Sequence, residues 1–512
     1  MLLNLAALAL LLAVPPARAA VVRLEAYGPD GRLLDQSGLR ALLDPAAAVP
    51  GSGLRLSGID GAALGGRPWW VDGSTAPAWS WEGSSRAVAS LPWPLPEDGY
   101  STVRLDADGL GYEDGRVILV NEEAARWAYG ALQESFKDRT GGAWKPAYKP
   151  SLKAKGLLGA AKDAVAVATA AAERRERARL FDRALAAVSV AWQQVLVEHG
   201  RQTVADPSAR ARLRWGLTLD ETAAARPTDA AAIAKGVAES GADWVRLVFG
   251  LPEDDAAFAK EASFTPYDEL IARLEERKVK VMGSVLDSLV WPAGGTAELC
   301  AARAKALARR YKDRVRSWEV SSEPNGDWLG GRGKTDDEAV LACARAAATA
   351  VKIVDATLET TATLHWWDGT APDGRHGLRD WLPWAKAKGF GDGIDAVALS
   401  VYPHRHPLGI SLEPVFRELR AAFPGKPVYL GGWSYGDTGE RPAYWWLSPE
   451  AEAVDGARKD LLMLYAAAAP TLTPESLGGG FFWSTLDLML PPARQATPLY
   501  RLYRKSLHDL RR

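Results

Sequence analysis

The chain has 512 residues, which is too long for one ordinary domain, so two or three domains are expected. Hydrophobic residues make up 47% of it and charged residues 24%, as in an ordinary soluble globular protein. Lys and Arg number 62 against 63 Asp and Glu, a net charge of -1, which gives no electrostatic basis for binding nucleic acid or an anionic membrane.

The first residues carry the pattern of a secretory signal peptide. An apolar run ends at Val14, and Ala17-Arg18-Ala19 follows as a small-residue cleavage site. The run is shorter than the roughly 20 residues that a membrane-spanning helix needs. We therefore expect residues 1–19 to be removed and the mature protein to be periplasmic or extracellular, without membrane insertion after cleavage.

Residues 20–120 show short alternating runs that turn residues interrupt. Residues 22–27 run into a Gly-Pro-Asp-Gly turn, and residues 102–106 into a turn that ends at Gly109. This pattern predicts a small antiparallel β-sandwich domain. A tryptophan-rich stretch falls within it, as a hydrophobic core or as a sugar-binding face: Trp69, Trp70, Trp79, Trp81 and Trp93.

Residues 121–211 shift in composition to Ala, Arg and Glu with helical periodicity. The pattern predicts one helix over 122–136, a break over 141–146, and a long helical stretch over 152–199 that Pro207 closes. We expect a helical connector that braces the β-sandwich against the rest of the chain.

Residues 212–512 alternate strand and helix patterns. The strand candidates are residues 214–219, 244–249, 279–285, the run from Val315 to Glu323, 360–365, 396–402, 427–430 and 480–484. Amphipathic stretches lie between them, among them 229–240, 266–277, 296–312, 336–355 and 412–423. Eight strand–helix units in about 300 residues predict a (β/α)8 TIM barrel.

Cofactor and metal motifs are missing from the sequence. The six His residues show no clustered ligand spacing, and no phosphate loop or nucleophile-elbow turn occurs, so we expect no metal and no cofactor. The only two cysteines, Cys300 and Cys343, fall in neighbouring helical patterns and form either one disulfide or two buried thiols.

One short stretch, residues 317–325, carries the strongest functional signal. It reads Ser-Trp-Glu-Val-Ser-Ser-Glu-Pro-Asn, with Glu323 at the end of a buried strand and Pro324 behind it. A carboxyl group fixed in this way suits acid/base chemistry on a glycosidic oxygen; the alternative is that it only caps the next element or pairs with an arginine. The stretch resembles the Trp-Glu-Val-Trp-Asn-Glu-Pro-Asn signature of clan A retaining glycoside hydrolases, nearest to the family 39 β-xylosidase type. Ser321 and Ser322 stand where that signature has Trp and Asn.

Active sites of TIM barrels lie where the strands end, so the strand-end residues are the candidates for substrate binding. They are Arg246, His365, Trp366, Tyr402, His404, Trp433 and Trp483. Acids, histidines and aromatic rings around one carboxylate suit a poly- or oligosaccharide. The resemblance implies that Glu323 is the general acid/base, that Arg246 hydrogen-bonds the nucleophile, that Tyr402 neighbours the site and that Trp483 forms a sugar platform. On the residues alone, Arg246 is equally a buried partner for Glu319.

The resembled family has its nucleophilic Glu at the end of the seventh strand, where this chain has Gly432. Three hypotheses follow. A hydrolase recruits its second carboxylate elsewhere, at about 5–5.5 Å from Glu323 for retention or about 6.5–9.5 Å for inversion. Alternatively, the barrel is an inactive glycan-binding relative, or a scaffold for another protein. The candidates for a displaced carboxylate are Asp437, Glu440, Asp487 and Asp220.

Overall fold

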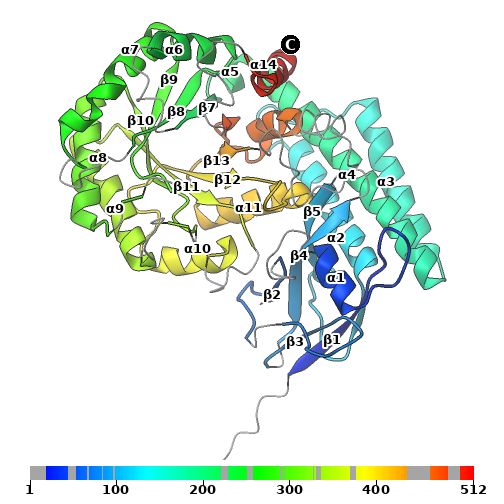
Figure 1. Cartoon of the computed structure of the whole chain (residues 1–512). Coiled ribbons are helices and arrows are strands. Elements are labelled where there is room, and N and C mark those ends of the chain that lie inside the picture. The colour runs from blue at the N-terminus through cyan, green and yellow to red at the C-terminus, as the bar shows by residue number, and fades with distance from the viewer. Residues whose placement is uncertain are drawn as a thin grey trace, which may run out of the picture.

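The computed structural model describes most of the chain from residue 19 onward. The described residues are 19–43, 53–65, 69–83, 85–95, 99–220, 229–250, 258–288, 291–292, 294–326, 328–329, 336–368, 376–434, 462–482 and 496–512. A barrel forms the C-terminal part, and two small sheets and a group of long helices lie against it (Figure 1).

Eight parallel strands close into the barrel in chain order. They are β7 (Trp215–Leu219), β8 (Trp244–Val248), β9 (Lys280–Ser284), β10 (Ser317–Ser322), β11 (Glu359–His365), β12 (Ala396–Val401), β13 (Val428–Trp433) and β14 (Gly480–Phe482). Nearly all strand residues are buried, as expected for strands that are covered on both faces. The predicted TIM barrel is confirmed, and its parallel strands all end at one edge.

Amphipathic helices surround the barrel. They are α6 (Ala230–Glu239), α7 (Asp268–Glu276), α8 (Ala297–Tyr311), α9 (Asp337–Val354), α10 (Leu378–Ala387), α11 (Leu412–Ala422) and α14 (Pro498–Arg511), with the short 3-10 turns η4 (Glu261–Tyr267), η5 (Gly409–Ser411) and η6 (Ala469–Thr471). Thr296 and Asp336 cap α8 and α9 by accepting backbone N–H groups. A disulfide between Cys300 and Cys343 joins these two helices, which decides between the two alternatives for the cysteines.

The N-terminal region contains two three-stranded sheets. One has the order β3 (Ala78–Trp81), β1 (Ala20–Glu25), β6 (Val117–Leu119), and the other β2 (Arg55–Gly58), β4 (Ala87–Leu95), β5 (Gly99–Leu105). The predicted antiparallel pattern is wrong for β1 and β6, which pair in parallel because the chain makes a long crossover between them. A helix, α1 (Gln36–Leu43), also interrupts the strands. All five tryptophans of this region are buried, so they form a core.

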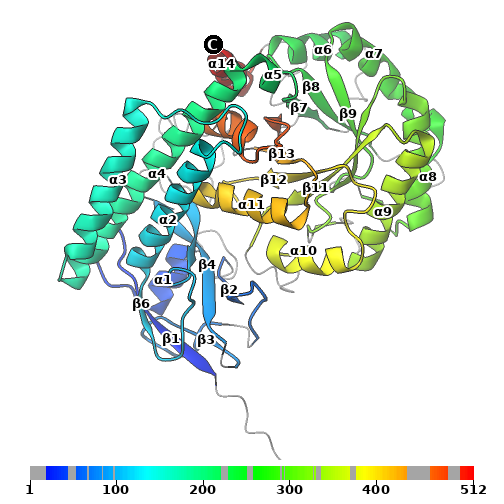
Figure 2. The same cartoon turned by 180° about the vertical axis from the view of Figure 1, so that it is seen from behind.

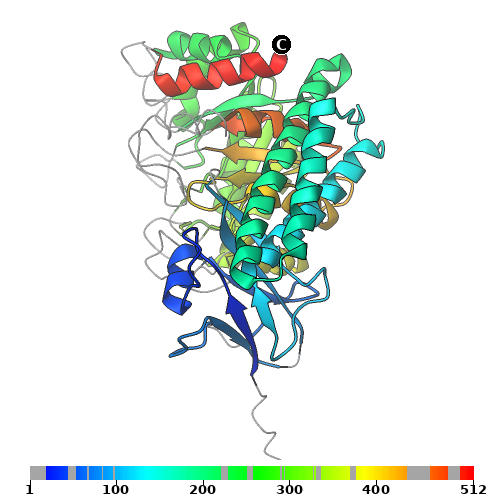
Figure 3. The ribbon, with the colours of Figure 1, turned by 90° about the vertical axis from the view of Figure 1, so that its right-hand side faces the viewer.

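Four helices follow: α2 (Val120–Thr140), α3 (Leu152–Ala170), α4 (Arg174–Ala205) and α5 (Pro207–Arg210). The long helical pattern is split because Glu173 caps a new helix by accepting the N–H groups of Arg175 and Glu176. Pro207 opens α5 instead of only ending a helix. Figures 2 and 3 show α2, α3 and α4 as one layer of long helices beside the barrel, with α4 packed against both of the others.

Direct hydrogen bonds join the N-terminal sheet to the loop after β12. The backbone N–H of Thr102 donates to the carbonyl of Leu408 at 3.2 Å, and its hydroxyl donates to Pro407 at 2.5 Å. The N–H of Ile410 donates to Ser101 Oγ at 2.7 Å. The N-terminal region therefore braces a loop at the C-terminal edge of the barrel.

Candidate functional site

Glu323 lies directly after β10, at the C-terminal edge of the barrel, and is only 7% exposed. Its φ of +51° falls in the left-handed region. The other described non-glycine residues with positive φ, Ala107, Asp108 and Lys278, lie in turns outside the site. Its N–H donates to the carbonyl of Thr363 on β11 at 2.6 Å. A strained residue that its neighbours hold in place is characteristic of a functional site.

Groups from three other strand ends bind the carboxylate of Glu323. Ser400 Oγ, on β12, donates to Oε1 at 2.5 Å, and Ser288 Oγ, after β9, donates to Oε2 at 2.9 Å. His365 Nδ1, at the end of β11, lies 3.6 Å from Oε1. Tyr402 also hydrogen-bonds this carboxylate. The side chain is thus fixed at the centre of the barrel mouth.

These contacts keep Glu323 ionised. Burial raises its pKa, but the hydrogen bond and the positive charge of His365, together with the hydroxyls of Ser400 and Ser288, lower the pKa by more, to about 2. Burial, and then the nearby negative charge of Glu323, raise the pKa of Tyr402 well above its usual value. At neutral pH the site therefore presents a carboxylate beside a protonated phenol.

His365 occupies a rigid position next to Glu323. Its backbone N–H donates to the side-chain oxygen of Asn325 at 2.8 Å, and the amide of Asn325 donates back to the His365 carbonyl at 2.9 Å. His365 Nε2 lies 3.0 Å from His406 Nδ1. Burial, followed by the charge of His365, holds the pKa of His406 well below its usual range. A neutral His406 therefore accepts a hydrogen bond from His365 whenever His365 carries two protons.

Replacing His365 with Gln is expected to raise the pKa of Glu323 from its value of about 2, because the strongest group that lowers this pKa is lost. Carbon-13 NMR of labelled glutamate, followed over a pH titration, measures the change directly. His508→Gln, on the C-terminal helix, is the matched control. An unchanged Glu323 titration in His365→Gln would contradict the assigned contact.

Arg246 holds two carboxylates next to this centre. Its Nε donates to Glu319 at 2.9 Å, and its Nη2 donates to both Glu319 and Asp287. Thr363 and Ser284 also donate to Glu319, at 2.5 and 2.6 Å. Arg246 is therefore a buried partner of Glu319, as one of the two sequence interpretations had it, and of Asp287 in addition.

The aromatic residues at the mouth differ from those expected. Trp366 and Trp433 lie in the packed interior, where their indole N–H groups donate to the carbonyls of Pro407 and Gly479, so neither presents a ring face. Partly exposed rings belong instead to Trp328 and Trp367, whose centroids lie 4.7 Å from His365 and 4.3 Å from His406. His404 lies beside Tyr402, with centroids 6.4 Å apart.

Of the candidate second carboxylates, only Asp220 falls within the described residues; it is buried directly after β7. Asp437, Glu440 and Asp487 lie outside the described residues, as does Trp483. Gly432 lies near the end of β13, the seventh strand of the barrel. A Cβ at this glycine would stand 3.4 Å from Ser400 Cβ and 3.6 Å from the Tyr402 hydroxyl, both of which contact Glu323.

The sequence did not single out Ser288, Ser400, Trp328 or His406 as binding residues. Asp287 was recognisable as the acid that follows the third barrel strand, and Ser400 as a residue that shares a strand face with Tyr402. The serines carry no signal of their own, since serine is common in every loop.

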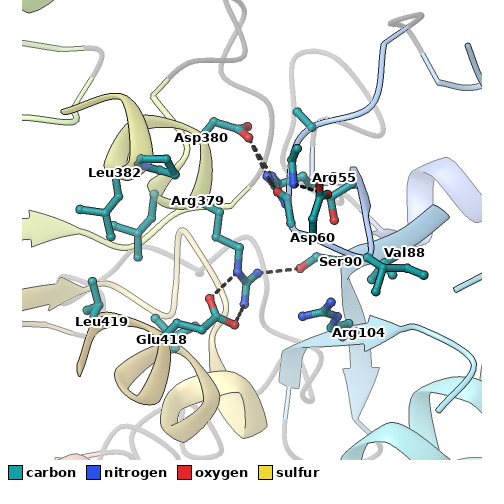
Figure 4. Close-up of a pocket in the computed structure, with 18 residues that line it drawn as sticks. Arg55, Asp60, Val88, Ser90, Arg104, Arg379, Asp380, Leu382, Glu418 and Leu419 are labelled. Carbon is teal, nitrogen blue, oxygen red and sulfur yellow. Dashed lines mark hydrogen bonds and ion pairs between the residues drawn. The ribbon is translucent and has the colours of Figure 1, made fainter. Parts of the chain in front are cut away.

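A cavity of about 720 Å³ lies between the N-terminal sheet and helices α10 and α11, away from Glu323 (Figure 4). Its charged groups pair with one another, both across the boundary and between the two barrel helices. Arg55 of β2 donates to Asp380 of α10 at 2.7 Å, and Arg379 donates to Glu418 at 2.9 Å and to Ser90 at 3.4 Å. Because the charges pair with one another, this cavity is best understood as a polar joint between the two parts of the chain.

Arg55→Met is expected to lower the free energy of unfolding by about 2 kcal/mol, since Asp380 loses a charged hydrogen-bond donor in a mostly buried setting. Urea denaturation measures the loss. Lys505→Met removes an exposed ion pair on α14 and serves as the control, with an expected change below about 1 kcal/mol. Equal effects of the two substitutions would contradict a role for Arg55 in the joint.

Two further observations bear on ligands and membranes. Among the described residues, no three or more His, Cys, Asp or Glu side chains gather so as to hold a metal ion. Within the same ranges, no helix combines the length and the apolar character that a membrane crossing requires.

Comparisons with known proteins find similarity in structure but not in sequence. No family model matches the sequence, and no curated protein matches it. Among solved structures, the chain is similar to a family 1 β-glucosidase from Thermotoga maritima, with 12% identity, 58% of this chain and 98% of that chain covered, and a TM-score of 0.44. The T. maritima β-glucosidase in complex with cyclophellitol gives 11% identity, the same coverage and a TM-score of 0.44. The barrel itself is established by its closed order of strands.

Proposed function

We propose that this protein is an exported glycoside hydrolase-like enzyme that acts on a β-linked glycan, with Glu323 as the group that exchanges a proton with the glycosidic oxygen. One observation carries the proposal. Glu323 is held in a left-handed backbone conformation at a barrel strand end, and side chains from three other strand ends converge on its carboxylate. A carboxylate that is fixed by its backbone and by several side chains at this edge of a TIM barrel is suited to catalysis or to ligand binding.

The low pKa of Glu323 requires a source for the proton that a leaving oxygen needs. His365 supplies it, because its Nδ1 faces Oε1 of Glu323 and the neutral His406 supports its other nitrogen. When a glycosidic oxygen approaches Glu323, that proton passes from His365 through the carboxylate to the oxygen.

The rim of the site fits a sugar. Trp328 and Trp367 present partly exposed rings beside His365 and His406, and sugar C–H faces pack on such rings. The carboxylate accepts hydroxyl hydrogens at the centre. The pattern of a rigid apolar rim around a few fixed polar groups is typical of small-ligand sites.

A second candidate function, glycan binding without hydrolysis, has its own supporting observation. Glu323 is ionised in the free protein, and Gly432 provides no carboxylate where the resembled hydrolases have their nucleophile. An ionised Glu323 accepts sugar hydroxyls well and donates a proton poorly, which is the behaviour of a binding site.

Turnover distinguishes the two functions. The purified mature protein is incubated with a panel of β-linked oligosaccharides and nitrophenyl β-glycosides, and the release of reducing ends and nitrophenolate is measured beside calorimetric binding. We expect turnover together with binding. Binding without turnover on any substrate would support the second candidate, and the absence of both would contradict a sugar site. Mass analysis of the secreted protein tests export, with Ala20 expected as the first residue.

A further inference from the structure

We infer that Asp287 is the second carboxylate of the site and acts on the anomeric carbon from the face opposite the leaving oxygen. The inference rests on the proposed function, because it assigns a role within the same reaction. Glycosidases with two carboxylates need one group to protonate the leaving oxygen and another to attack, or to activate water, on the far side of the sugar. The seventh barrel strand, β13, does not supply the second group, because none of its residues is acidic and Gly432 has no side chain.

The position of Asp287 places it in the same network as Glu323. It follows β9, which neighbours β10 in the barrel. The next residue, Ser288, donates directly to Glu323 Oε2 at 2.9 Å. The charges of Glu323, Arg246 and Asp287 all act on Tyr402, so the phenol lies near both carboxylates. Both acids therefore belong to one cluster at the mouth.

Arg246 anchors Asp287 by an ion pair between their buried side chains. The same guanidinium binds Glu319, but Glu319 is fully buried, and both of its oxygens accept hydrogen bonds from Thr363, Ser284 and Arg246. Asp287 is 6% exposed and comes after the end of β9, whereas Glu319 lies within β10. Of the two carboxylates that Arg246 holds, Asp287 is the one placed to reach a ligand.

The reaction makes one bond to the anomeric carbon and breaks another. A new C–O bond forms at the anomeric carbon, either from the Asp287 carboxylate itself or from a water whose proton Asp287 accepts. The bond from the anomeric carbon to the leaving oxygen breaks, and its electron pair stays on that oxygen, which takes the proton that passes from His365 through Glu323. Both routes form the new bond on the face opposite the leaving group.

The test uses the full-length mature protein and a nitrophenyl β-glycoside that the wild type hydrolyses. Asp287→Gly is expected to lower kcat at least 100-fold while calorimetric binding of the sugar persists. Added azide restores nitrophenolate release, and the product is the α-glycosyl azide, because the small anion enters on the face that Asp287 served. Glu323→Ala with azide is run in parallel and does not yield the α-azide as its rescued product.

Controls separate this role from a structural one. Asp268→Gly removes another aspartate that an arginine holds, Arg310, but on the outer helix α7, and is expected to leave kcat unchanged. If Asp287→Gly loses its melting transition, Asp287→Asn, which preserves the shape, replaces it and must show the same loss of kcat. Turnover that survives in Asp287→Asn but not in Glu323→Gln overturns the role of Asp287 and leaves the proposed function standing. A wild type without turnover on any glycoside overturns both.

Discussion

Glu323→Gln is expected to lower kcat by about 10²- to 10⁴-fold, the usual contribution of a positioned acid/base, with little change in sugar binding. Glutamine keeps the length and shape of the side chain, so the hydroxyls of Ser400 and Ser288 retain a neighbour of the same size. What disappears is the negative charge that faces His365, and with it the carboxylate that passes a proton to the leaving oxygen. The loss therefore concerns chemistry and not the docking of the substrate.

Parallel kinetics and calorimetry measure this result, and Asp268→Asn, remote from the mouth, is the control. Unchanged kcat in Glu323→Gln would remove Glu323 from the reaction. If wild type and variant bind sugar equally and neither turns it over, the barrel is a glycan-binding site, and the second candidate function replaces the first.

The same substitution has a consequence for stability that depends on pH. The folded pKa of Glu323, about 2, lies below its reference value of 4.5, so the ionised side chain stabilises the fold fully above about pH 4.5 and loses this contribution as the pH falls toward 2. Wild type and Glu323→Gln should therefore differ most in melting temperature near neutral pH. Their difference should shrink steadily between about pH 4.5 and pH 2.

The barrel was predictable from the sequence because each of its strands is a compact apolar run that an amphipathic helix follows, and this pattern is local. The direction of β6 was not, since its pairing with β1 depends on a crossover of about 90 residues rather than on any local signal. For residues 152–199 the helical periodicity correctly predicted helix, but not that the stretch forms two helices. The division between α3 and α4 depends on one capping residue, Glu173.

The site was predictable at its centre and less so around it. Glu323 could be predicted because a strand pattern, an acid and a proline follow one another in the sequence. Ser288 and Ser400 contact Glu323 only because the closed barrel brings their strands to the same place, which no local pattern shows. Trp366 and Trp367 show the difficulty most clearly. They are adjacent and chemically identical, and the strand geometry buries the first while the second stays partly exposed.

Glu413→Ala is expected to cost about 3–5 kcal/mol in the free energy of unfolding, because it leaves a buried arginine without its counter-charge. Glu413, near the start of α11, accepts bonds from Arg139 Nη2 at 2.6 Å and from Trp192 Nε1 at 2.8 Å. Ser135 donates to it as well, at 2.7 Å. These three partners come from α2 and α4, so one carboxylate ties the long helices to the barrel.

Urea denaturation measures the cost, with Glu475→Ala as the control, because its pair with Arg420 is exposed and is worth at most about 1 kcal/mol. A double variant, Glu413→Leu with Arg139→Met, should recover much of the loss, since no unpaired charge stays buried. A cost below about 1 kcal/mol for Glu413→Ala would contradict a tie of this kind. The tie also reaches the site: α11 continues directly from the loop that carries Tyr402 and His406, so Glu413→Ala should lower kcat even at temperatures where the protein remains folded.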